Sequence, residues 1–119
     1  MYSSFENLEI WQRATRLTVT LYDALKDCRD FGLKDQMTRS AVSIGSNIAE
    51  GAERDSKIEF ARFLHIAKGS AAELRTQVYI AGQVGIFEKV FESELAEELK
   101  ALSSMIHGLI KSLKKEKTF

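Results

Sequence analysis

The 119-residue chain has no proline, a single cysteine and no net charge. One thiol cannot form an internal bridge, which excludes a disulfide-stapled secreted domain and favours a reducing compartment. Equal numbers of acidic and basic residues, 17 of each, argue against a strongly basic nucleic-acid-binding domain. No run approaches the roughly 20 apolar residues that span a bilayer, and the N-terminal residues lack the pattern of a signal peptide. We therefore expect a soluble, cytoplasmic protein with no membrane partner.

The missing proline and the spacing of apolar residues predict an all-α fold. Apolar side chains recur at alternating steps of three and four residues through four segments, as at Leu95, Leu99 and Leu102. The predicted helices cover residues 7–28, 33–52, 56–85 and 88–115 of a single domain. Short connections favour antiparallel neighbours. The sequence therefore predicts an antiparallel up-down-up-down four-helix bundle.

Serine and glycine residues mark the expected ends of these helices. Ser56 and Glu59 fit a capping box, in which each side chain accepts a hydrogen bond from a free backbone N–H. Gly32 and Gly85 are placed to take the left-handed conformation that follows a helix end. Gly45 lies inside the second predicted helix, where glycine costs about 1 kcal/mol relative to alanine. A kink and a close helix crossing both fit this position.

The sequence offers no arrangement typical of an enzyme or a metal site. A di-iron bundle needs inward-pointing Glu-x-x-His pairs, but neither His65 nor His107 has a glutamate three residues before it. Two histidines and one cysteine are too few for a structural zinc site. We interpret His65 as an ordinary surface or interface residue and Cys28 as a packed thiol. The prediction is a non-catalytic protein with no cofactor, metal or small-molecule substrate.

Two stripes of polar residues follow helical spacing and are candidates for a structural network or an interface. Small residues in segments 40–43 and 69–72 lie beside these stripes and would permit close helix approach. A solvated surface, a network within one chain and a contact between chains all fit this pattern. The stripe residues are Arg39, Ser43, Asn47 and Glu50 in the second helix and Arg62, Ser70, Glu73 and Gln77 in the third.

Four sequence elements carry a family resemblance. They are Phe5-x-x-Leu8-x-x-Trp11-Gln12, Arg39-Ser40-Ala41-Val42-Ser43-Ile44, Ser46-Asn47-Ile48-Ala49-Glu50-Gly51 and Phe60-x-x-Phe63-Leu64-x-Ile66-Ala67-x-Gly69-Ser70-x-x-Glu73-Leu74. As far as Gly85 the chain closely resembles the bacterial four-helix-bundle proteins encoded within intervening sequences of 23S ribosomal RNA genes. The resemblance implies a small helical bundle that forms a ring-like homopentamer. It also implies no established enzymatic activity and a proposed role in binding RNA or DNA.

The resemblance and the charge pattern together predict how a neutral chain binds nucleic acid. A ring repeats each basic patch, and phosphate contacts from several copies add to affinity and to salt sensitivity. We therefore predict a non-catalytic homo-oligomer that binds RNA or DNA. The candidate contacts are Arg54, Lys57, Lys68, Lys111, Lys114 and Lys115, the last three within a lysine-rich tail that continues to Lys117. The alternative is an adaptor that binds a partner helix through the face around Asn47, with no nucleic-acid role.

Overall fold

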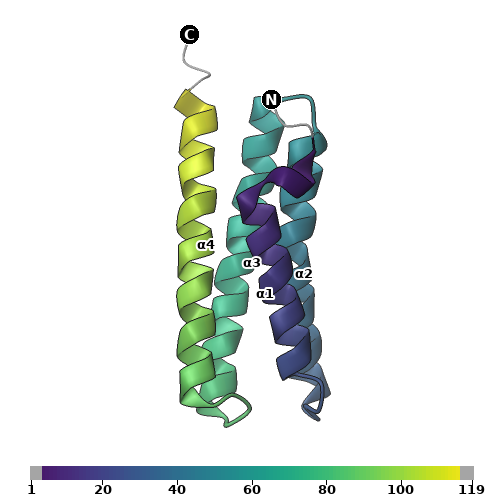
Figure 1. Cartoon of the computed structure of the whole chain (residues 1–119), viewed down its shortest axis with the longest axis vertical. Coiled ribbons are helices and arrows are strands. Elements are labelled where there is room, and N and C mark those ends of the chain that lie inside the picture. Colours follow the sequence, from purple (N-terminus) through teal and green to yellow (C-terminus); the bar gives the residue numbers. More distant parts are fainter. Residues whose placement is uncertain (1–3, 116–119) are drawn as a thin grey trace.

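The computed structural model describes residues 4–115, and within them it shows four α-helices and one short 3-10 helix. Lys117 and the first three residues lie outside the described range. The chain runs down α1, up α2, down α3 and up α4, in a rod of 51 × 20 × 20 Å (Figure 1). The predicted all-α, up-down-up-down bundle is confirmed. The elements are η1 (Phe5–Asn7), α1 (Glu9–Ala24), α2 (Phe31–Glu53), α3 (Lys57–Gln83) and α4 (Lys89–Lys115).

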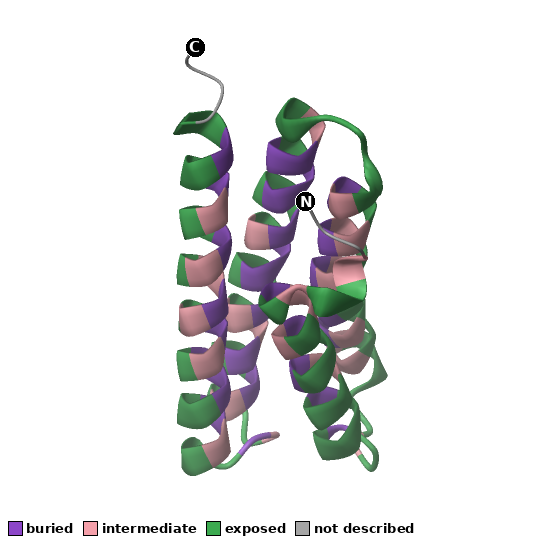
Figure 2. Ribbon diagram, turned by 45° about the horizontal axis from the view of Figure 1, so that its top comes forward, coloured by how far each residue is buried: buried purple, intermediate pink, exposed green. Residues whose placement is uncertain are grey.

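Each helix turns one apolar stripe toward a common core (Figure 2). α2 packs against α3, α3 against α4 and α1 against α2, while a smaller contact between α1 and α4 closes the bundle. Burial of each large aliphatic side chain contributes about 1.5–3 kcal/mol. Fully buried examples, one from each helix in order, are Leu21, Ile44, Leu64 and Leu102. Among the described helices, none combines the length and apolar character that a membrane span requires.

The first helix connection differs from the prediction. α1 ends at Ala24, before a turn over residues 25–27, instead of continuing to residue 28. α2 begins at Phe31 because the Asp30 side chain accepts a hydrogen bond from the Leu33 backbone N–H at 3.1 Å. Gly32 therefore lies in the first turn of α2 and does not take the predicted left-handed conformation. Gly85 does take it, with a φ of 85° just after α3.

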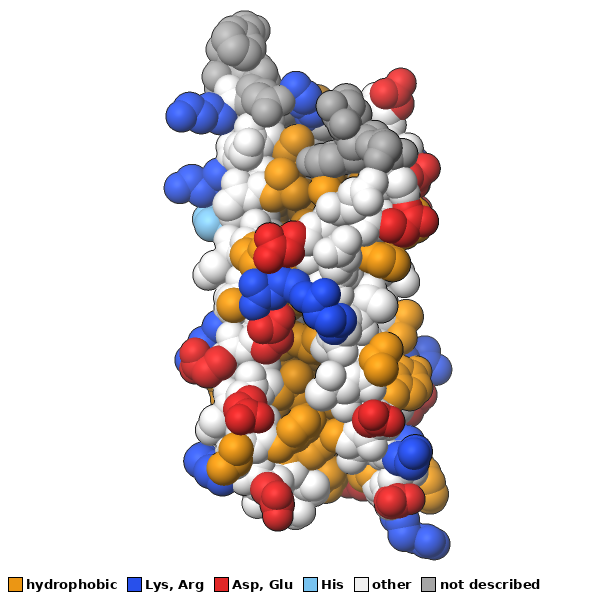
Figure 3. Space-filling view, viewed as in Figure 1, with side chains coloured by type: hydrophobic (Ala, Val, Ile, Leu, Met, Phe, Trp, Pro, Cys, Tyr) orange, Lys and Arg blue, Asp and Glu red, His pale blue; other side chains and the backbone are white. Residues whose placement is uncertain are grey.

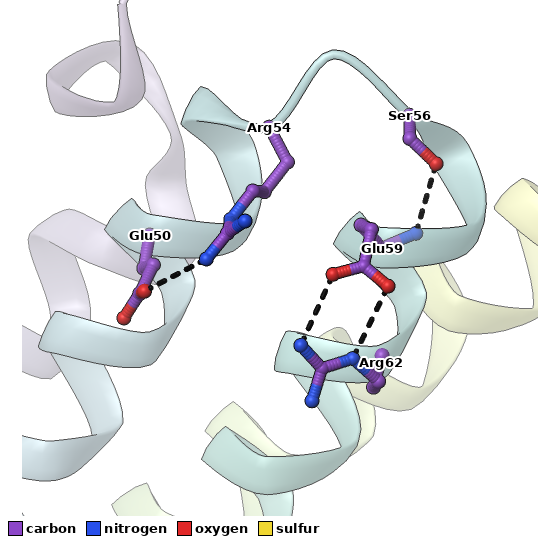
Figure 4. Close-up of polar contacts among 5 residues, drawn as sticks. All are labelled: Glu50, Arg54, Ser56, Glu59 and Arg62. Atoms are coloured by element: carbon purple, nitrogen blue, oxygen red, sulfur yellow. Dashed lines mark hydrogen bonds and ion pairs between the residues drawn. The ribbon is translucent and has the colours of Figure 1, made fainter.

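The start of α3 contains half of the predicted capping box. Ser56 Oγ accepts a hydrogen bond from the Glu59 backbone N–H at 3.1 Å, as expected. The Glu59 carboxylate turns instead to Arg62, whose Nη2 and Nε lie 3.0 and 3.2 Å from its two oxygens (Figure 4). These hydrogen bonds lower the pKa of Glu59. The Glu59 carboxylate thus forms a charge-assisted pair with the Arg62 guanidinium. This pair replaces the hydrogen bond from the Ser56 backbone N–H that a complete capping box contains.

At Gly45 the structure shows neither a helix break nor a tight crossing. α2 runs unbroken through this residue, and a Cβ built there would lie 3.9 Å from both Ala14 Cβ and Trp11 Nε1. We expect Gly45→Ala to raise the free energy of unfolding by about 0.5–1 kcal/mol, because alanine loses less backbone entropy in a helix. Urea denaturation followed by circular dichroism measures this change. A destabilised variant would contradict the ordinary spacing of α1 and α2 at this point.

Candidate functional site

α3 and α4 bring three lysines and both histidines of the chain to one surface, which we call the α3–α4 basic patch. Its members are His65 and Lys68 from α3 and His107, Lys111 and Lys114 from α4. Lys68 Nζ lies 3.1 Å from His107 Nδ1, which fixes the two helices side by side at this level. Steps of four and three residues place the α4 members on one face of that helix.

Positive charge in the patch lowers the pKa of His107. The nearby Lys68 ammonium is the largest cause, followed by burial and by Lys111, with smaller effects from His65 and Lys114. A lysine ammonium can only donate, so Nδ1 of His107 accepts this hydrogen bond and the ring proton is on Nε2. His107 is therefore neutral at pH 7. Among the described residues, no carboxylate is one of the groups that shift its pKa.

Of the other predicted basic contacts, Arg54 and Lys57 lie elsewhere on the surface, whereas Lys115 lines a shallow hollow with Lys111 and Lys114. Arg54 follows the last residue of α2, and its Nη2 donates to Glu50 Oε2 at 3.1 Å (Figure 4). Lys57 is the exposed first residue of α3, and Lys115 is the exposed last residue of α4. The α3–α4 basic patch thus contains Lys68, Lys111 and Lys114, with Lys115 beside the last two.

Sequence analysis missed His65 and His107 as members of this patch. Their residue type suggests metal ligands or ordinary surface residues, and two histidines cannot complete a metal site. The available signal was their spacing, since His65 precedes Lys68 by three residues and His107 precedes Lys111 by four. Within residues 4–115, no three histidine, cysteine, aspartate or glutamate side chains come together as a metal ion would require.

Arg54 belongs to a second cluster, at the junction of α2 and α3, which is centred on Phe63. The guanidinium of Arg54 lies 5.0 Å from the centre of the Phe63 ring, and that of Arg62 lies 4.5 Å from it. A Cβ built at Gly51 would lie only 2.7 Å from Phe63 Cβ. Glycine at this position therefore allows α2 and α3 to approach closely, and both arginines stack on the aromatic side chain at the contact.

Part of the two polar stripes forms a network between α2 and α3 within one chain. The hydroxyl oxygens of Ser43 and Ser70 lie 2.8 Å apart, and Ser70 is buried. Asn47 Nδ2 donates to the backbone carbonyl of Ser43 at 2.8 Å and to its hydroxyl at 3.0 Å. This network links α2 and α3 at the outer, polar edge of their contact. The apolar stripes beside it face the core.

The remaining stripe residues are placed differently. The Arg39 side chain is 78% exposed and pairs with Asp35 at 2.9 Å, one turn earlier on α2. Glu50 pairs with Arg54, and Glu73 is exposed on α3. Gln77 Oε1 is buried with no hydrogen-bond partner in the described part of the molecule. These residues therefore do not extend the network around Ser43.

A groove of about 450 Å³ runs between α1 and α4. Its apolar lining includes Leu17, Phe91 and Leu95. Arg13 bridges the two helices, with Nη2 2.7 Å from one Glu98 oxygen and Nε 2.9 Å from the other, and these bonds raise the pKa of Arg13. Figure 3 shows hydrophobic side chains along this face, divided by a band of charged ones. The apolar lining of the groove therefore lies on one side of this ion pair.

The architecture and the surface together define a small all-helical bundle with a basic patch on its α3–α4 face. A family model described as 23S rRNA-intervening sequence protein matches residues 6–108, and the chain belongs to this family. The resemblance stated from the sequence is thereby confirmed.

One solved structure shows the same fold. It is a crystal structure of a protein of unknown function from the S23 ribosomal protein family, from Bacteroides thetaiotaomicron VPI-5482. It resembles this chain with a TM-score of 0.80 and 21% sequence identity, over 86% of this chain and 98% of that one. At this identity the likeness concerns the fold alone. The comparison with curated proteins found no match.

Proposed function

We propose that this chain is a non-catalytic, homo-oligomeric bundle that binds RNA or DNA through the α3–α4 basic patch. The observation that carries the proposal is the convergence of Lys68, Lys111 and Lys114 around His107, with no carboxylate of the described residues among the groups that shift its pKa. Two lysines elsewhere, Lys89 and Lys100, pair with Glu92 and Glu97 at 3.7 and 3.3 Å. Ammonium groups that are not paired with acids can neutralise phosphates, and this contact releases the counterions that surround the nucleic acid.

The size of the patch suits a short stretch of phosphate backbone. The seven-residue step from His107 to Lys114 along α4 spans about 10 Å, at about 1.5 Å per residue. One nucleic-acid strand presents a phosphate about every 3.4 Å along a duplex axis, so this length faces about three phosphates. One patch on a neutral chain therefore supplies only a few contacts. Repetition in the homopentamer that the family resemblance implies would raise the affinity.

The alternative function, an adaptor that binds a partner helix around Asn47, has less support. The Asn47 amide is half-buried and already donates to the carbonyl and hydroxyl of Ser43. A partner would have to compete with these hydrogen bonds. In the α3–α4 basic patch Lys111 and Lys114 are exposed, and Lys68 keeps two ammonium N–H donors beyond the one that contacts His107.

The direct test replaces the three patch lysines together, in the variant K68Q/K111Q/K114Q. We expect its affinity for a labelled structured RNA or a duplex DNA to fall by at least about tenfold at low salt. The slope of log affinity against log salt should fall by about 0.9 for each phosphate that the variant no longer neutralises. Fluorescence anisotropy at about 50 and 200 mM salt measures both quantities.

The matched control is K26Q/K34Q/K89Q, which makes the same charge change at the opposite end of the rod. Its affinity should stay close to that of the unmodified protein. Equal weakening in the two variants, or no binding by the unmodified protein at low salt, would contradict the proposal. Light scattering tests whether the protein is a homo-oligomer. A monomer at the concentration used for the binding measurements would contradict that part of the proposal.

A further inference from the structure

We propose that His107 is a phosphate-contacting residue of the α3–α4 basic patch that engages when it takes up a proton, so that nucleic-acid binding tightens as the pH falls below 7. This inference rests on the proposed function and adds its regulation. The chain has two histidines, and both lie in this patch although they come from different helices. Imidazole is the side chain whose ordinary pKa lies between pH 5 and 8, so a response of the patch in this range points to histidine.

The contact between Lys68 and His107 shows how protonation changes the patch. While His107 is neutral, its Nδ1 lone pair accepts a hydrogen bond from the Lys68 ammonium across 3.1 Å. Proton uptake places a hydrogen on Nδ1, so two donors would then face each other and the contact must break. The imidazolium and the released ammonium both become free to donate to phosphate oxygens. One proton thus adds one cation and frees one more N–H of the Lys68 ammonium, which has three.

The groups around His107 determine the direction of the effect. Lys68 and His65 face it from α3, and Lys111 and Lys114 lie beside it on α4, and all of them oppose its protonation. The pKa of His107 is accordingly below its ordinary value in the free protein. Bound phosphates bring negative charge to the same place and remove this opposition. Linkage then requires that nucleic acid raise the pKa of His107 and that acid tighten nucleic-acid binding.

His65 lies close enough to add to the charge around His107. It is exposed on α3, one turn from Lys68, and it contributes to the positive field on His107. Protonation of His107 adds one cation to the three lysines of the patch. Each additional cation placed against phosphate strengthens the attraction and steepens its salt dependence.

The test compares RNA affinity at pH 7.5 and 5.5, at constant ionic strength, for the full chain and the variant H65Q/H107Q. Each linked proton can change the affinity by at most about tenfold per pH unit. We expect the unmodified chain to bind at least about fivefold more tightly at pH 5.5, within that limit. Whatever its affinity at pH 7.5, the variant should change less than about twofold between the two pH values, because no histidine proton remains to be linked.

A second measurement follows the imidazole Cε1–H resonances by NMR in the unmodified chain, which does not depend on the variant folding. The pKa of His107 should rise when RNA is added. An unchanged pKa on binding, or an equal pH response in H65Q/H107Q, would overturn the inference. Tight binding with no pH dependence would overturn it and leave the proposed function standing. No binding at either pH would overturn both.

Discussion

Replacing Gly51 with alanine is expected to lower the free energy of unfolding by about 2–3 kcal/mol, toward the upper end of the usual loss from overpacking. A Cβ at this position would lie 2.7 Å from Phe63 Cβ and 3.3 Å from the Phe60 backbone oxygen. Both of these atoms are fixed by the backbone of α3. No change of side-chain rotamer relieves the clash, so α2 and α3 must move apart.

Gly69→Ala is the matched control, because it makes the same substitution inside a neighbouring helix. A Cβ at Gly69 would have no atom within 4 Å among those considered. This variant should gain about 0.5–1 kcal/mol from the better helix propensity of alanine. Urea denaturation of both variants measures the difference. Similar midpoints for the two would contradict the close approach of α2 and α3 at Gly51.

Replacing Phe63 with alanine is expected to lower the free energy of unfolding by about 3–4 kcal/mol, as for other buried phenylalanines. Phe63 is only 7% exposed, and its ring is the surface on which Arg54 and Arg62 stack. The substitution removes the apolar burial and both cation–π contacts. The exposed ion pairs of the arginines replace little of that loss, since such pairs contribute about 0–1 kcal/mol.

Chemical denaturation of F63A at two salt concentrations measures this effect and its origin. The loss should be nearly independent of salt, because most of it comes from apolar burial. Ile58→Ala, at a 59% exposed position in the same helix, should change stability by less than about 0.5 kcal/mol. A loss below about 1 kcal/mol for F63A would show that its ring contributes little to the α2–α3 contact.

The helices could be predicted well from the sequence because apolar residues recur at the same steps of three and four in every segment. An α-helix places such residues on one face, where they can be buried together. The ends of the helices were harder to predict, because residues that favour a helix start and residues that favour a helix end occur close together there. Asp30 and Gly32 lie two residues apart, and a glycine at such a place is typical of a helix end. The aspartate side chain in fact caps the start of α2. A hydrogen bond to a free backbone N–H decided the boundary.

The candidate site was predicted only in part, because it depends on how far one helix is shifted along another. Helical spacing places Lys111 and Lys114 on one face of α4, but it does not say which turn of α3 lies beside them. The contact of Lys68 with His107 answers that question. Arg54 could not be placed from spacing either, because its position over Phe63 depends on the close approach at Gly51.

The pair of hydroxyl groups at Ser43 and Ser70 has a consequence beyond its own small energy. A slide of α3 along α2 by one helical turn, about 5.4 Å, would part these oxygens and also carry Phe63 away from the gap that Gly51 leaves. Uncharged residues thereby determine how far α3 is shifted along its neighbouring helices. The alignment of the cations in the α3–α4 basic patch therefore depends on contacts between α2 and α3 that contain no charged group.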